Sequence, residues 1–351
     1  MAISKKKIAT SFQNWKGWLY LLPALAILSV FTFWPIFNTI FMAFSEGYSA
    51  LEHAAGATFP FGIGNFVKVI GYKNFLNCLQ NTCLLCVITV PVSTLLALLI
   101  SVALNSIKFL NRTLQTIYFL PYVTNSIAIG MVFAMMFNIV GLKQVNVAEY
   151  LSTGGQYTIY NIYTDVNGEK WGFVAQSWGI INNLLQLFGI NPVNWINSGG
   201  NINGGSSTYV ANIAVMVVYI VWNALPFKIL ILLGGLQSVN KQYYDAAKID
   251  GTSRVRTFWR ITVPLLSPML AYVIITGFIG GFKEYSSIVG IFGEGMGPSG
   301  NGSLQTIVGY IYDALKTDSY GTASAASLIL FGIILIVTLI NLYVSSKKVH
   351  Y

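Results

Sequence analysis

Six apolar stretches alternate with polar segments along this 351-residue chain. A helix needs about 20 consecutive apolar residues to cross the hydrocarbon layer of a bilayer. The predicted spans are residues 17–44, 79–104, 115–138, 208–236, 265–291 and 324–344. We therefore predict an all-α integral membrane fold with six transmembrane helices.

Composition supports this class. Hydrophobic residues make up 55% of the chain, charged residues 9%, and the mean hydropathy is +0.64, values typical of membrane proteins. The net charge of +9 could suggest nucleic-acid binding, but the basic residues are spread between the spans. The first apolar stretch is longer than a signal-peptide core and lacks a small-residue cleavage site, so we expect it to be retained.

The distribution of charge predicts the topology. Six spans place both termini on one side, and the segments on that side hold thirteen basic residues against Asp245 and Asp250. The basic residues are Lys5, Lys6, Lys7, Lys16, Lys108, Arg112, Lys241, Lys248, Arg254, Arg256, Arg260, Lys347 and Lys348. The other side holds five basic residues against eight acidic ones. By the positive-inside rule, both termini are predicted to be cytoplasmic.

The polar segments define the expected organisation. It comprises a cytoplasmic segment 1–16, spans within 17–138, an extracytoplasmic insertion 139–207, further spans within 208–345 and a cytoplasmic tail 346–351. The insertion is too long for an ordinary connection, so we expect a small fold of its own, taken as helical. Its second half has amphipathic spacing and two tryptophans suited to a membrane interface.

Several chemical motifs are absent from the sequence. It has no G-x-x-x-x-G-K-[ST] phosphate loop, no H-E-x-x-H and no G-x-S-x-G. Cys78, Cys83 and Cys86 lie on one apolar segment without a fourth cysteine, so we expect packing roles, with no metal and no disulfide. The chain is therefore predicted to have no catalytic site. Uphill transport by it would draw energy from another polypeptide.

The most distinctive segment is YDAAKIDGTSRVRTFWRITVPLLSP, residues 244–268. Asn240 or Ser238 can cap a first short helix, and Gly251 suits a left-handed helix end. Ser253 can cap a second helix, and two prolines open the next span. A polar helix–turn–helix between two spans must meet water or a partner protein. Its arginines could instead hold it at lipid headgroups.

This segment resembles the EAA loop of ABC importer permeases. The matching residues are Ala246, Ala247, Asp250, Gly251, Phe258, Ile261, Pro264 and Pro268. Asp245, Thr252 and Val263 depart conservatively from that pattern, and Asn240 stands where proline is common. The resemblance implies a coupling loop at residues 240–263 whose ATPase-contacting residues are Asp245, Ala246, Ala247, Asp250, Gly251 and Arg254.

The likeness extends over about residues 17–345 and is strongest to the carbohydrate branch, similar to the maltose-transporter membrane subunits. It implies a type I ABC importer permease fold in a prokaryotic plasma membrane and sugar import. The implied partners are a second permease subunit, two cytoplasmic ATPases that bind ATP and magnesium, and an extracytoplasmic solute-binding protein that the insertion could contact. No cofactor is expected in this chain.

Three charged residues fall within or at the edge of spans, where each costs about 2.5–3.5 kcal/mol. Lys228 could snorkel or line a pathway, and Lys283 and Glu284 lie deeper. In the resembled family, sugar contacts come from the fourth and fifth spans, which implies substrate-pathway roles for Asn223, Phe227, Glu284 and Tyr285. Gly277 and Gly281 form a G-x-x-x-G pattern that permits close helix contact, within the chain or with a second subunit.

Two alternatives remain open from the sequence. One is an importer for another solute, such as glycerol phosphate or a polyamine. The other is an ion-coupled secondary transporter or channel, which would need ion-coupling polar residues at mid-membrane and would not need the coupling loop.

Overall fold

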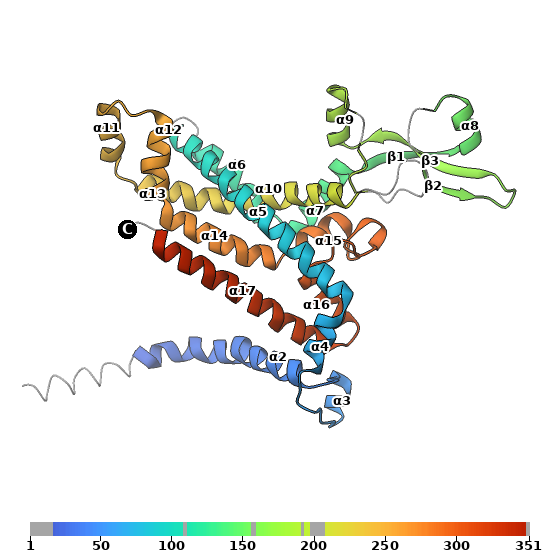
Figure 1. Cartoon of the computed structure of the whole chain (residues 1–351), viewed down its shortest axis with the longest axis horizontal. Coiled ribbons are helices and arrows are strands. Elements are labelled where there is room, and N and C mark those ends of the chain that lie inside the picture. Colours follow the sequence, from blue (N-terminus) through green and yellow to red (C-terminus); the bar gives the residue numbers. More distant parts are fainter. Residues whose placement is uncertain (1–16, 108–110, 156–158, 191–192, 197–207, 349–351) are drawn as a thin grey trace, which may run out of the picture. The chain divides into compact units, whose positions relative to one another are not determined.

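The structure, a computed structural model, describes residues 17–107, 111–155, 159–190, 193–196 and 208–348 (Figure 1). The predicted cytoplasmic segment 1–16 and the end of the tail lie outside these residues. The chain forms two compact units, one built from residues up to 72 with 311–329, the other from 73–310 with the residues from 330 onward.

The first unit begins with a continuous apolar helix, Gly17–Phe44, which includes the π-helical turn η1 (Ser29–Phe33) and α2 (Trp34–Phe44). The short helices α3 (Ala50–Ala54) and α4 (Gly64–Gly71) follow. Buried Asn65 donates from Nδ2 to the carbonyls of Ala43 at 3.1 Å and Ser45 at 2.8 Å. Carbonyls at a helix end lack partners within the helix, so this side chain fixes α4 against the end of α2.

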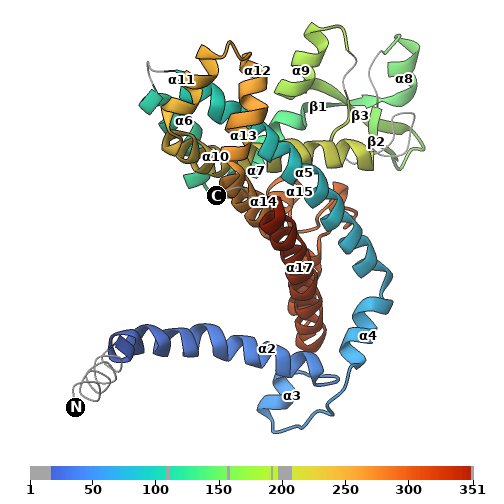
Figure 2. The same cartoon turned by 60° about the vertical axis from the view of Figure 1, so that its left-hand side comes forward.

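Three long helices form the centre of the second unit. They are α5 (Lys73–Ser106), α10 (Tyr209–Ser238) and α14 (Ser267–Phe282), and they pack side by side (Figures 1 and 2). Leu98, Leu232 and Val273 bring one side chain from each helix into a buried cluster. The C-terminal helix α17 (Tyr320–Lys348) follows α16 (Ile307–Lys316).

Among the described residues, four helices are long and apolar enough to cross a membrane, and two bent pairs raise the number of spans to as many as six. The predicted span 115–138 consists of α6 (Asn111–Val123) and α7 (Ser126–Phe137), bent by 105°. Asn125 causes α7 to begin anew, because its side chain accepts hydrogen bonds from the amides of Ile127 and Ala128. The predicted span 115–138 is therefore a bent pair of helices.

The predicted span 265–291 is also interrupted. Helix α14 ends at Phe282, and α15 (Ser286–Phe292) is separate. At its other end α14 meets Arg254–Leu265 at an angle of 69°. Gly130 of α7 and Gly290 of α15 lie backbone to backbone, since a Cβ on Gly130 would come within 2.7 Å of the Gly290 Cα.

The insertion contains a three-stranded antiparallel sheet, so the expectation of a helical insertion was wrong, and the all-α class holds only outside it. Strands β1 (Ile139–Asn146), β2 (Ile159–Thr164) and β3 (Lys170–Trp178) are ordered β1-β3-β2. Helices α8 (Val147–Ser152) and α9 (Ile180–Leu187) accompany them. Isoleucine, tyrosine, tryptophan and valine favour strands, and the Asn167–Gly168 pair suits the hairpin turn between β2 and β3.

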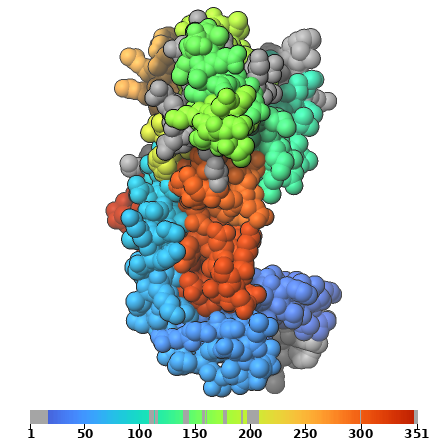
Figure 3. Space-filling view, turned by 90° about the vertical axis from the view of Figure 1, so that its right-hand side faces the viewer, coloured from blue at the N-terminus to red at the C-terminus, as the bar shows by residue number. Residues whose placement is uncertain are grey.

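The segment after α15, which contains the short helix η3 (Pro298–Gly300), is held against α5. Asn81 of α5 donates from Nδ2 to the carbonyls of Ser303 at 3.0 Å and Gln305 at 2.9 Å, and it accepts from the Tyr209 hydroxyl at 2.6 Å. Figure 3 shows this orange segment beside the light-blue N-terminal part of α5. The buried Asn81 side chain thus joins α5, α10 and the segment that follows α15.

Candidate functional site

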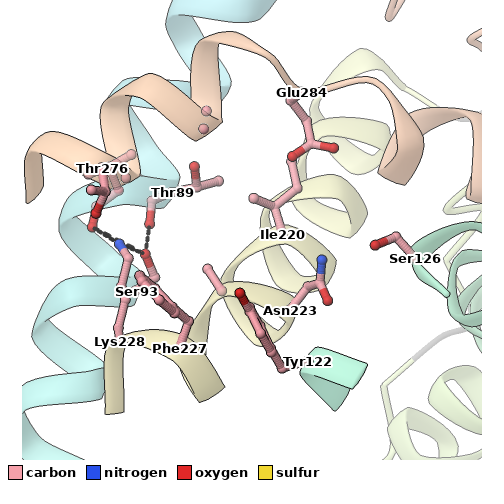
Figure 4. Close-up of a pocket in the computed structure, with 15 residues that line it drawn as sticks. Thr89, Ser93, Tyr122, Ser126, Ile220, Asn223, Phe227, Lys228, Thr276 and Glu284 are labelled. Carbon is pink, nitrogen blue, oxygen red and sulfur yellow. Dashed lines mark hydrogen bonds between the residues drawn. The ribbon is translucent and has the colours of Figure 1, made fainter. Parts of the chain in front are cut away.

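A cavity of about 350 Å³ lies between α5, α10 and α14 (Figure 4). Its polar lining comes from four parts of the chain: Thr89 and Ser93 of α5, Asn223 and Lys228 of α10, Thr276 of α14, and Glu284 beyond its end. Tyr122 of α6 and Ser126 of α7 complete the wall beside Phe227. Hydroxyl, amide and aromatic groups around one space are suited to a polar organic solute.

Lys228 is the most buried charged residue of this wall, with 4% of its surface exposed. Its Nζ donates to Ser93 Oγ at 2.7 Å, to Thr94 Oγ1 at 2.9 Å and to the Val90 carbonyl at 3.3 Å. Each hydroxyl in turn donates to a carbonyl of its own helix, Ser93 to Thr89 and Thr94 to Val90. The lysine is therefore buried and held by α5.

Aromatic rings form another part of the wall. Phe227 stacks on Tyr122 with ring centroids 5.7 Å apart and an interplanar angle of 18°, and it lies 6.5 Å from Tyr272. Offset-stacked pairs of this kind are stabilised by their quadrupoles. They present a flat apolar face beside hydrogen-bonding groups.

Glu284 contributes a carboxyl group to the cavity from the irregular segment between α14 and α15. Its Oε1 accepts from the amide of Ser287 at 3.2 Å, and its carbonyl accepts from the Thr306 hydroxyl at 2.8 Å. In Figure 4 its carboxyl enters the cavity from a different side than the Lys228 amine. The break after Phe282 thus places this carboxyl in the cavity.

The glycines of the G-x-x-x-G pattern face α5 of the same chain. A Cβ on Gly277 would lie 3.1 Å from Val90 Cγ1 and 3.2 Å from Lys228 Nζ, and a Cβ on Gly281 would lie 2.8 Å from Cys86 Sγ. Of the two contacts left open by the sequence, the structure shows the one within the chain.

The coupling loop has the predicted local structure. Asn240 caps α11 (Lys241–Ile249) by accepting from the Gln242 amide at 3.0 Å. Gly251 adopts φ +65°, the left-handed region that favours glycine, and the Thr252 amide donates to the Ala247 carbonyl at 2.9 Å. Ser253 caps α12 (Arg254–Thr257), which continues through the π-helical η2 (Phe258–Thr262) into α13 (Val263–Leu265).

The two arms of the coupling loop also contact each other, since the Tyr244 and Thr262 hydroxyls lie 3.3 Å apart. Ala247 is buried, whereas the other residues predicted to contact an ATPase are exposed: Asp245, Ala246, Asp250, Gly251 and Arg254. Asp245 pairs with Lys248 at 3.2 Å on the surface. Ile249 and Val255 expose 87% and 69% of their surfaces, so the loop presents an apolar patch beside its charges.

Three of the four predicted substrate-pathway residues meet at the cavity: Asn223, Phe227 and Glu284. Tyr285 does not line it and packs instead against the buried cluster around Tyr219. The cavity is also lined by residues that were not predicted from the sequence: Thr89, Ser93, Tyr122 and Thr276. Hydroxyls one helical turn apart in an apolar segment, as at Thr89 and Ser93, were the available signal.

Comparison with known proteins identifies a family that this chain matches. Residues 90–350 match the model of a family described as "binding-protein-dependent transport system inner membrane component". The chain is similar to the lactose transport system permease protein LacF of Rhizobium radiobacter, with 24% identity covering 99% of this chain and 100% of that protein. It is 29% identical to the arabinooligosaccharides transport system permease protein AraP of Halalkalibacterium halodurans, over 97% of this chain and 91% of that one.

The fold is similar to a chain in the crystal structure of a bacterial alginate ABC transporter in complex with an alginate pentasaccharide-bound periplasmic protein. The TM-score is 0.70 at 19% identity, and the match covers 97% of each chain. Because the family match spans most of the chain and the fold agrees over nearly its full length, the chain belongs to the family of binding-protein-dependent transport system inner membrane components.

Proposed function

We propose that this chain is the membrane-spanning permease subunit of an ATP-driven importer for an oligosaccharide. One observation carries the proposal: two of the helices that line the cavity, α10 and α14, also flank the coupling loop. Helix α10 provides Asn223, Phe227 and Lys228 and ends at Ser238, whereas α14 provides Thr276 and begins directly after α13. A displacement of the coupling loop would therefore move two walls of the cavity together.

The proposed partners are two cytoplasmic ATPases, a second permease subunit and an extracytoplasmic solute-binding protein. The exposed apolar patch at Ile249 and Val255 supports an ATPase-binding role for the coupling loop. The three-stranded sheet of the insertion supports a protein-binding role, since it is a folded element beyond what a connection requires. Both termini are proposed to be cytoplasmic, in the plasma membrane of a prokaryote, on the charge distribution alone.

An oligosaccharide fits the cavity better than a small ion does. Stacked rings beside hydroxyl, amide and carboxyl groups match the alternating apolar faces and hydroxyl edges of a sugar. The relatives named for lactose and arabinooligosaccharides support this substrate class. The alternatives, another solute or an ion-coupled transporter, have less support, and uptake that persisted without ATP under a maintained ion gradient would favour the second.

The coupling role can be tested by changing the turn of the coupling loop. In Gly251→Pro, proline fixes φ near −65° and cannot adopt the observed +65°. It also removes the amide that donates to the Lys248 carbonyl at 3.1 Å. We expect ATP-dependent uptake of labelled sugar by the assembled transporter to fall at least tenfold, while the amount of protein in the membrane is unchanged. Asp250→Arg should act in the same way.

Gly56→Pro provides a matched control. Gly56 has φ +88°, and its amide donates to the His53 carbonyl at 3.0 Å, so the same backbone change is made outside the coupling loop. Uptake by this variant should remain within twofold of the unaltered chain. Equal loss of uptake in both glycine variants, or normal uptake in Gly251→Pro, would refute the assignment.

A further inference from the structure

We propose that the imported solute carries an acidic group, a carboxylate or a phosphate, and that Lys228 selects for it. This inference rests on the proposed import function and specifies its substrate class. Lys228 lies in an apolar helix, and a charged side chain within a membrane costs free energy of insertion, so such a residue is functional by default. Here the lysine is 4% exposed and still lines the cavity.

No carboxylate within the described part of the chain forms an ion pair with Lys228 at 4.0 Å or less. Its partners are two hydroxyls and a carbonyl, all neutral. Glu284, the other ionisable side chain of the cavity wall, accepts from the Ser287 amide instead. The Lys228 amine therefore borders the cavity without a carboxylate in direct contact (Figure 4).

The hydrogen bonds of Lys228 also leave room for an anion. The two hydroxyl contacts, at 2.7 and 2.9 Å, are good hydrogen bonds. The third, to the Val90 carbonyl, is 3.3 Å long, and that carbonyl already accepts from the Thr94 hydroxyl at 2.7 Å. A solute carboxylate or phosphate oxygen could replace this weakest contact without leaving the Val90 carbonyl unpaired. Charge-assisted hydrogen bonds of this kind are about twice as strong as neutral ones.

Gly277 of α14 leaves space for the amine, since a Cβ there would lie 3.2 Å from Nζ. Ser93 and Thr94 hold the amine from α5 in the space that Gly277 leaves beside it. An anion that neutralises it has to come into the cavity.

The test compares two probes of equal length, trigalacturonate and its neutral trimethyl ester, in uptake by the complete transporter in proteoliposomes. With the unaltered chain, we expect the acid to be imported at least tenfold faster than the ester. Lys228→Met should lower uptake of the acid at least tenfold relative to uptake of the ester by the same variant. Because the same solute-binding protein serves every variant, a changed acid-to-ester ratio arises in the permease.

Lys283→Met is the matched control, because Lys283 is exposed and does not line the cavity; its acid-to-ester ratio should equal that of the unaltered chain. Faster import of the ester by the unaltered chain, equal loss of both probes in Lys228→Met, or the same ratio change in Lys283→Met would overturn the inference and leave sugar import standing. The first of these results needs no variant, so a misfolded Lys228→Met does not prevent the test. Import of neither probe by a transporter that hydrolyses ATP would overturn the proposed oligosaccharide as well.

Discussion

Single residues set how closely the helices around the cavity approach each other. Gly281 allows α14 to pack on α5 at Cys86, and Gly277 does so at Val90. Polar residues join the same helices, with Lys228 held between Ser93 and Thr94 and Asn81 bound to the loop after α15. Because these contacts leave little spare space, small changes in side-chain size at them should alter stability measurably.

A methyl group added at position 281 should separate α14 from α5. In Gly281→Ala the new Cβ would come within 2.8 Å of Cys86 Sγ, and overpacking of this kind typically costs about 1–3 kcal/mol. We expect a lower thermal unfolding midpoint for the detergent-solubilised protein, and Cys86→Ala should restore most of the loss when combined with it. Gly234→Ala, whose Cβ meets nothing within 4 Å, should leave the midpoint unchanged. Additive losses in the double variant would contradict the proposed contact.

The residues of the cavity show what a sequence can predict at this scale. Asn223, Phe227 and Glu284 were singled out by resemblance to a family, and they do line one space. Tyr122 and Thr89 could not be placed there, because only the packing of α6 and α5 on α10 brings them together. Tyr285 follows Glu284 directly, yet the break after α14 turns it toward a buried cluster.

Helices, strands and loops of this chain differ in how far their structure is determined by residues that are neighbours in the sequence. The coupling loop was predicted nearly residue by residue, because a cap at Asn240, a left-handed Gly251 and a cap at Ser253 are each determined by neighbouring residues. The bend between α6 and α7 was not predicted, although three polar residues, Thr124, Asn125 and Ser126, interrupt the apolar run there. The sheet was missed although its turn residues, Asn167 and Gly168, were visible in the sequence.

The hairpin between β2 and β3 should weaken in acid. Asp165 Oδ1 accepts from the amides of Glu169 and Asn167, both at 2.9 Å, and the Glu169 amide contributes most to lowering the pKa of this carboxyl below its usual value of about 3.9. A lowered folded pKa means that the stabilisation is fully present above about pH 4 and is lost as the pH falls through the folded pKa.

Hydrogen exchange of the Glu169 and Asn167 amides measures this effect. Protection relative to the intrinsic exchange rate should be constant above about pH 4 and should decline below it. In Asp165→Ala, protection should be low at every pH. A decline of the same size in Asp165→Ala would show that another group is responsible.

At the scale of the whole molecule, the unit that contains residues 73–310 combines the two features on which the proposed importer function rests. Its cavity lies between α5, α10 and α14, and its coupling loop connects α10 to α14. The sequence predicted the spans and the coupling loop, because apolar length and helix caps are properties of contiguous residues. It could not predict that the two helices flanking the coupling loop are also cavity walls, since this depends on how distant segments pack.

The central claim is that the coupling loop controls access to the cavity. The most direct measurement follows the labelling of a single cysteine in the cavity wall, Thr276→Cys, in a chain whose three native cysteines are replaced. The complete transporter is placed in proteoliposomes, and a membrane-impermeant thiol reagent is applied from one side. We expect ATP with vanadate to change the labelling rate at least tenfold, and we expect no such change when the chain also carries Gly251→Pro. A labelling rate that ATP does not alter, or that ATP alters equally in the Gly251→Pro variant, would contradict the claim.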